Sequence, residues 1–139
     1  MQSVGVLALQ GSFSEHLTKL AQLTEVLPVA VKTAADLEQV DRLILPGGES
    51  TAISRLLQRT GLSELLKRRV KEGLPALGAE PLPLVFIRAP WIERVGEQTE
   101  ILGEYAGHII AARQGKLLAT SFHPELTDSD AVYRYFLQL

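Results

Sequence analysis

The chain has 139 residues, of which 46% are hydrophobic and 22% charged, and its formal net charge is -2. These values predict one domain and favour a globular protein over a disordered one. The basic residues are scattered, which excludes the clustered basic face of a nucleic-acid-binding protein. No apolar run approaches the ~20 residues that cross a bilayer, and the start, MQSVGVLALQG, is typical of a strand and not of a signal peptide, so we expect a cytoplasmic protein. The sequence has no cysteine, which excludes disulfides, thiolate metal sites and a cysteine nucleophile within it.

Predicted strands and helices alternate through the first half of the chain. The run at residues 4–9 is continuously apolar, as in a strand buried on both faces. Ser12 and Thr33 occupy positions where helix N-caps are expected, and Glu15 completes a capping box with Ser12. This alternation indicates a parallel sheet with helices on both faces. The expected strands are residues 4–9, 26–31, 43–45 and 75–77, and the expected helices follow Ser12 or span residues 34–39, 52–58 and 63–71.

The second half changes to an antiparallel pattern. Two dipeptides ending in glycine separate three strand-like runs, and such dipeptides are hairpin signals. Asp128 or Ser129 is expected to cap a closing helix that reaches Leu139. The runs are residues 99–105, 108–113 and 116–122, and the dipeptides are Ala106-Gly107 and Gln114-Gly115.

The junction after the fourth predicted strand is too short for this pattern. A second apolar run at residues 84–87 follows residues 75–77 with only residues 78–83 between them. Parallel neighbours need a crossover of about a dozen residues or more. Either residues 84–87 pair differently from the earlier strands, or a segment is missing between Gly78 and Glu80.

A glycine turn follows the third predicted strand. Gly47 and Gly48 allow positive φ angles, so that backbone N–H groups can point outward, and the next helix adds positive partial charge at its N-terminus. Such a turn, continuing as Glu49-Ser50, can hold an oxyanion or a polar ligand. It lacks the endings of a Walker loop and of a nucleophile elbow. An ordinary tight turn with Ser50 or Thr51 as a helix cap explains the same residues equally well.

A second candidate is the pair His123 and Glu125 at the end of the last predicted strand. In an extended segment these two positions project to the same face, and Pro124 between them stiffens the link. A carboxylate beside an imidazole fixes its tautomer and stabilises its cation, as in a catalytic triad. Taken alone, the pair is more simply a strand-end histidine near a solvated glutamate.

Two further polar residues stand at predicted strand ends. Arg88 ends the run at residues 85–88, and Gln10 closes the first strand, so both would lie at the edge where open α/β sheets bind ligands. For Arg88 a surface ion pair is the simpler alternative. His16 and His108 are expected on the surface.

Four stretches together resemble one family. They are GVLALQG at residues 5–11, LILPGGEST at 43–51, VFIRAP at 85–90 and SFHPEL at 121–126. Pro-Gly-Gly and His-Pro-Glu occur across the class I, or triad, glutamine amidotransferases, and the whole combination resembles the glutaminase subunits of pyridoxal 5'-phosphate synthase. The resemblance runs in order over nearly the whole chain. It implies one amidotransferase domain over residues 1–139, a three-layer α/β/α fold with a mostly parallel, flavodoxin-like sheet and an antiparallel C-terminal meander.

The resemblance also implies a reaction and roles for the residues. Such subunits hydrolyse glutamine to glutamate and ammonia with a cysteine, a histidine and a glutamate, need no cofactor or metal, and pass the ammonia to the synthase subunit. His123 and Glu125 match the last two triad members, and Gln10 matches a residue at the site edge that also faces the partner. The matched substrate-binding residues are Gly47, Gly48, Glu49, Ser50, Ile87 and Arg88.

One departure from the family pattern is severe. The family has a Gly-Thr-Cys-Ala-Gly nucleophile turn just after the fourth strand, whereas here Gly78 is followed by AEPLPLVFIRAP. Either a segment with the nucleophile belongs between Gly78 and Glu80, or it is deleted and the chain is inactive.

The alternatives to a glutaminase follow from that departure. The chain could be a glutamine-binding scaffold without a nucleophile. A serine hydrolase that uses Ser50 or Ser121 with His123 and Glu125 is a weaker alternative, because neither serine has the sequence frame of a nucleophile elbow.

Overall fold

The computed structural model describes residues 1–9, 13–46, 55, 57–79, 99–105, 107–120, 124 and 129–139. None of the helices in these ranges is long and apolar enough to cross a membrane. The strands are β1 (Gln2–Leu7), β2 (Val26–Val31), β3 (Arg42–Leu45), β4 (Ala76–Ala79), β5 (Glu100–Tyr105), β6 (His108–Gln114) and β7 (Leu117–Thr120). The helices are α1 (Phe13–Ala21), α2 (Ala34–Glu38), α4 (Leu62–Lys71) and α5 (Ala131–Phe136).

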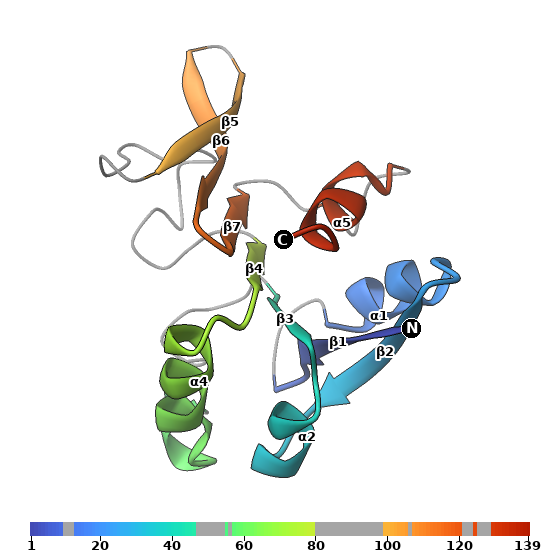
Figure 1. The fold of residues 1–139 in the computed structure, drawn as a ribbon, viewed down its shortest axis with the longest axis vertical. Helices are drawn as coiled ribbons and strands as arrows, with labels where there is room; N and C mark the ends of the chain where they lie inside the picture. The colour runs from blue at the N-terminus through green and yellow to red at the C-terminus, as the bar shows by residue number, and fades with distance from the viewer. Residues whose placement is uncertain are drawn as a thin grey trace.

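Within the described residues the strands form one seven-stranded sheet in the order β2-β1-β3-β4-β7-β6-β5 (Figure 1). The strands from β2 to β7 in this order pair in parallel, and β6 and β5 continue the sheet as an antiparallel meander. The order β2-β1-β3-β4 is that of a flavodoxin-like sheet. The predicted α/β fold is therefore confirmed.

Helices α1 and α5 cover one face of the sheet. Leu20 of α1 and Phe136 of α5 belong to one buried cluster with Val6, Ile44 and Leu77 of the central strands. These strand residues alternate with residues that point to the other face, as the two-residue period of a strand requires. The runs that looked buried on both faces thus pack on two helical layers.

Helices α2 and α4 cover the opposite face. Leu37 of α2 and Leu62 of α4 pack with Val31 of β2 and Leu43 of β3 in a second buried cluster. Figure 1 shows these helices on the side of the sheet away from α1 and α5. In each of the two layers, apolar residues of short helices close over the sheet.

Several boundaries were predicted closely, and one strand begins earlier than predicted. β2 has the predicted bounds, whereas β1 spans Gln2–Leu7 and not residues 4–9. The register explains the shift, because every residue of β1 pairs with one of β2, from Gln2 with Val26 to Leu7 with Val31. The predicted helix at residues 52–58 lies largely outside the described residues.

Local signals at helix and strand ends were accurate in two cases. Thr33 caps α2, because its hydroxyl accepts a hydrogen bond from the Asp36 backbone N–H. The Asp36 side chain in turn accepts one from the Thr33 backbone N–H, which completes a capping box. Gly107 and Gly115 in the two hairpins have φ angles of 81° and 58°, in the left-handed region that glycine adopts without strain.

The prediction for the closing helix was wrong in detail. α5 begins at Ala131, its N-cap is Asp130, and it ends at Phe136. The Ala131 backbone N–H donates to the Ser129 hydroxyl at 3.2 Å, so Ser129 satisfies a free N–H of the first turn without being the cap. A polar run of candidate caps does not by itself say which residue starts the helix.

Asp41 provides a test of stability against pH. Its carboxylate accepts hydrogen bonds from the Ser3 backbone N–H and hydroxyl, both at 2.9 Å, and these bonds hold the pKa of Asp41 below its ordinary value. A carboxylate with a depressed pKa stabilises the fold above its unfolded-state pKa of ~3.9, and this stabilisation is lost as the pH falls through the folded-state pKa. Asp41→Asn is therefore expected to lower the free energy of unfolding at pH 7 but much less near pH 3. Denaturant unfolding at both pH values measures this.

The matched control is Glu64→Gln, which removes an exposed ion pair with Lys67. Such pairs contribute little to stability, so this variant should differ little from wild type at either pH. An Asp41→Asn loss that is equal at pH 7 and pH 3 would contradict the assignment.

Candidate functional site

The carboxyl ends of the parallel strands meet at one edge of the sheet. The pairs Leu45 with Gly78 and Gly78 with Ala119 place the ends of β3, β4 and β7 in one row. β1 runs parallel to β3, with Val6 opposite Ile44, and so ends at the same edge. In open α/β sheets ligands bind outside this edge.

Most of the predicted site residues follow these strand ends directly in the chain. Gln10 comes three residues after β1 ends at Leu7, and the glycine turn begins two residues after β3 ends at Leu45. His123 comes three residues after β7 ends at Thr120. Gln10, Gly47, Gly48, Glu49, Ser50, Ile87, Arg88, His123 and Glu125 all lie outside the described residues, so the placement of their side chains stays a prediction.

β4 occupies the centre of this edge. It pairs with β3 on one side and with β7 on the other, so Gly78 lies between the strand that leads to the glycine turn and the strand that leads to His123. The end of β4 is thus flanked by the ends of β3 and β7, the two strands after which the predicted glycine turn and His123 follow in the chain.

The base of this edge is closely packed. Thr120 at the end of β7 is only 2% exposed, and Pro46 and Pro124, beyond β3 and β7, are buried.

The shifted pKa values among the described residues belong to structural contacts elsewhere. Hydrogen bonds from the backbone of Lys32 and from Thr33 lower the pKa of Asp36, and those from Ser3 lower the pKa of Asp41. The described residues contain no group of three or more acidic or histidine side chains arranged to hold a metal ion.

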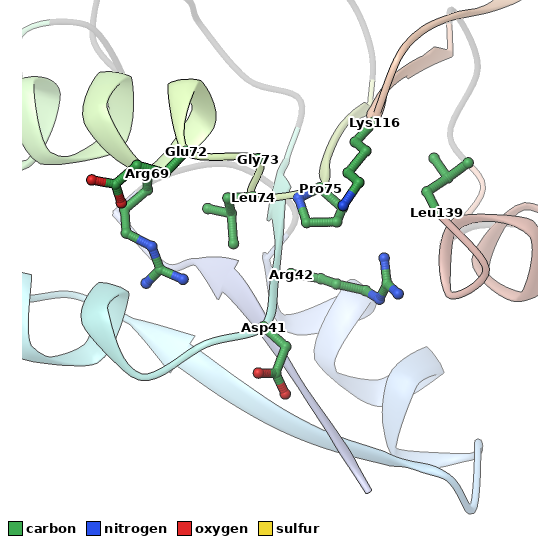
Figure 2. A pocket seen from close by; sticks show the side chains of 9 residues that line it. All are labelled: Asp41, Arg42, Arg69, Glu72, Gly73, Leu74, Pro75, Lys116 and Leu139. Atoms are coloured by element: carbon green, nitrogen blue, oxygen red, sulfur yellow. The ribbon is translucent and has the colours of Figure 1, made fainter.

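A cavity of about 410 Å³ opens at the opposite, amino edge of the sheet (Figure 2). Its place is fixed by the starts of the strands, since Arg42 begins β3, Pro75 precedes β4 and Lys116 precedes β7. The lining residues are Asp41, Arg42, Arg69, Glu72, Gly73, Leu74, Pro75, Lys116 and Leu139.

The two arginines of this cavity serve the fold. Arg42 donates to the Gln2 side chain at 2.6 Å and to the Phe136 carbonyl at 3.2 Å, and burial lowers the pKa of Arg42. Arg69 donates to the Leu37 and Val40 carbonyls at 2.6 and 2.8 Å. Because these guanidinium groups hold α5 and the segment before β3 in place, we assign the cavity a structural role.

The prediction of a surface position for His16 was wrong. His16 is fully buried, and its Nδ1 lies 2.8 Å from the hydroxyl of buried Tyr133. Its spacing contained the signal, because His16 lies three residues after Phe13 and four before Leu20, on the apolar face of the helix.

Comparison with known proteins identifies the family. The SNO glutamine amidotransferase family matches residues 6–81 and again residues 75–139. The chain belongs to this family. Each of the two matched parts of the chain contains strands that end at the carboxyl edge of the sheet. β3 and β4 lie in the first part, and β7 lies in the second.

Two similar proteins carry the name pyridoxal 5'-phosphate synthase subunit PdxT. The protein of Ruminiclostridium cellulolyticum is 36% identical over 188 aligned positions, which cover 100% of each chain. That of Kineococcus radiotolerans is 38% identical and covers 99% of this chain and 94% of the relative. A solved structure described as a glutamine amidotransferase is 32% identical, with a TM-score of 0.84 and 97% of each chain covered.

The alignments are longer than the chain. The Ruminiclostridium protein aligns over 188 positions, and this chain has 139 residues, so at least 49 positions, 188 less 139, have no residue here. The two parts of the family match overlap at residues 75–81, around the end of β4.

Proposed function

We propose that this protein is the glutaminase subunit of a pyridoxal 5'-phosphate synthase. It hydrolyses L-glutamine to glutamate and ammonia and delivers the ammonia to the synthase subunit, in vitamin B6 biosynthesis in the cytoplasm. The observation that carries the proposal is the shared carboxyl edge of β3, β4 and β7, from which the glycine turn, the junction at Gly78 and the His-Pro-Glu segment follow. The full-length likeness to PdxT proteins supports the same function.

The proposed mechanism follows from the order of these segments. A cysteine thiolate attacks the carboxamide carbon, and N–H groups of the Gly47–Ser50 turn stabilise the oxyanion. His123 takes the thiol proton and gives it to the leaving ammonia, while Glu125 orients the imidazole. Water then hydrolyses the thioester to glutamate. Ile87 and Arg88 contact the substrate, and Gln10 lies at the site edge towards the synthase.

We further propose that the nucleophile belongs to a segment between Gly78 and Glu80. The division of the family match into two parts, which overlap at residues 75–81, supports this position. At least 49 positions of the alignment with the Ruminiclostridium relative have no residue in this chain. A segment of that length would be long enough for a turn and a crossover helix.

Exposed apolar residues on β5 and β7 also support the proposal of a segment between Gly78 and Glu80. Leu117 pairs with Ala76, and Ala76 with Leu43, so Leu117 lies on the face that α2 and α4 cover elsewhere. Ile101, opposite Ala112, shares that face, and Leu117 and Ile101 are 40% and 43% exposed. A right-handed crossover leaving β4 towards β7 lies on the same face as α4 and would cover both.

A glutamine-binding scaffold without a nucleophile is the second candidate. The absence of cysteine from the 139 residues favours it, and so does the length of the connection from β4 to β5. Residues 80–99 separate these strands, and such a length suffices for a parallel crossover. The sheet therefore forms without the extra segment.

One experiment on protein purified from its own source separates the two. The glutaminase proposal predicts that the intact mass exceeds 15.2 kDa by about 5 kDa, which is the mass of some 49 residues at this chain's mean residue mass. It also predicts that ammonia release rises when the synthase subunit is added. A mass of 15.2 kDa without ammonia release would establish the scaffold. Equal rates with and without the synthase subunit would remove the coupling between the two.

A further inference from the structure

Strand β2 forms one margin of the sheet. Within the described residues it pairs with β1 alone, and Figure 1 shows it at the outer side of β1. Its sequence, VLPVAV, carries no charge, and Leu27 is 53% exposed. An apolar, uncharged strand at the edge of a sheet is a template for pairing with a strand of another molecule. Such a strand therefore requires a feature that prevents association.

Hydrogen bonds at the two ends of β2 show which of its backbone groups face outward. The Glu25 carbonyl accepts a hydrogen bond from the Gln2 N–H at 3.0 Å, and the Val31 carbonyl accepts one from the Ala8 N–H at 2.9 Å. Along a strand, the N–H and C=O of one residue point to the same side, and the side alternates from one residue to the next. The odd-numbered residues of β2 therefore direct these groups to β1, and the even-numbered residues direct them to the open side.

Most N–H groups on the open side are already used or missing. The Val26 N–H donates to the Leu23 carbonyl at 3.2 Å, and the Lys32 N–H, just after the strand, donates to the Asp36 carboxylate at 3.0 Å. Pro28 has no N–H, and its ring occupies the place where the hydrogen would point. A strand that approached this side would find a proline at the middle of β2.

The position of the proline is compatible with the sheet itself. Pro28 pairs with Val4 of β1 in the register of the two strands, but its nitrogen faces the open side, so no hydrogen bond to β1 is lost. A proline one residue earlier or later would remove a bond between β2 and β1. Edge strands accept proline where the missing N–H would face away from the sheet.

We propose that Pro28 keeps β2 from pairing with the β2 of a second copy of this chain. Among residues 26–32, the contacts above leave Ala30 with the one outward N–H that can donate. A two-fold axis at Pro28 would place the two proline rings opposite each other. Each copy would then donate only from Ala30, to the Val26 carbonyl of the other copy. This role of Pro28 is independent of the proposed glutaminase activity.

Pro28→Val tests this role, because it gives an outward N–H back to each copy. We expect the self-association constant of the purified protein, measured by sedimentation equilibrium, to rise about 10- to 100-fold. Amide exchange at residue 30 should slow in the associated form. A Pro28→Val protein that associates no more than wild type would overturn the proposal. If Pro28→Val does not fold, Pro28→Ala gives back the same N–H and replaces it.

Two further variants separate strand pairing from added apolar surface. Ala30 is exposed, so Ala30→Val enlarges the apolar edge without adding an N–H, and we expect its association to equal that of wild type. Pro28→Val combined with Ala30→Pro moves the proline two residues along the same edge and should return association to the wild-type level. An equal rise in Ala30→Val, or association that persists in a folded double variant, would contradict strand pairing. Denaturation midpoints establish that each variant is folded.

Discussion

Insertion of a thiol-bearing segment between Gly78 and Glu80 is expected to convert a chain that releases no ammonia from glutamine into a glutaminase. The 139 residues contain no cysteine, and an amide resists attack by water without an activated nucleophile. With the segment of the Ruminiclostridium relative inserted and the synthase subunit present, we expect ammonia release to rise by at least ~10³-fold. Coupled assay of glutamate and ammonia measures the change.

The structure explains why this junction should accept an insertion. β4 pairs with β3 from Ala76 to Gly78 and with β7 from Ala76 to Ala79, so its register is fixed on both sides up to Gly78. An added crossover on the α4 face would bury Leu117 and Ile101, which are now 40% and 43% exposed. We therefore expect the denaturation midpoint to rise along with the activity.

The control is the same insertion with its nucleophile cysteine changed to alanine. It should gain the stability without the activity, because it carries the same packing and no thiol. Ammonia release by the 139-residue chain itself, or equal release by the cysteine and alanine insertions, would show that another group performs the attack.

Sequence patterns predicted the elements wherever local chemistry decides the structure. The apolar run of β2, the Thr33 cap of α2 and the glycines of the two hairpins each specify their structure within a few residues. The start of β1 was missed because it depends on pairing between Gln2 and Val26. That pairing joins residues far apart in the chain, so the local hydrophobic pattern around Gln2 does not predict it.

The sequence predicted the place of the site better than the arrangement of its side chains. Alternation of strands and helices predicts the parallel pairing of β3 with β4. It did not predict the parallel pairing of β7 with β4, because β7 lies in the half of the chain whose pattern is antiparallel. The side chains that would act there lie outside the described residues, so their roles rest on family resemblance. Burial of His16 was missed because histidine is polar, although its helical spacing is that of a core residue.

His123→Ala in the insertion-bearing subunit is expected to abolish glutamine hydrolysis, with a loss of at least ~10³-fold in kcat. The imidazole is the proposed carrier of the thiol proton, and alanine offers no replacement. Glutamine affinity should change little, because the proposed substrate contacts come from the turn after β3. Steady-state rates with the synthase subunit, together with calorimetric binding of glutamine, measure both.

Glu125→Gln is the matched comparison on the same segment. It removes the charge that stabilises the imidazolium and orients the ring but leaves the proton carrier, so the loss in kcat should be about 10- to 100-fold smaller than for His123→Ala. A larger loss for Glu125→Gln than for His123→Ala would reverse the two assignments. Retained turnover in His123→Ala would exclude a proton relay through this histidine and with it the triad.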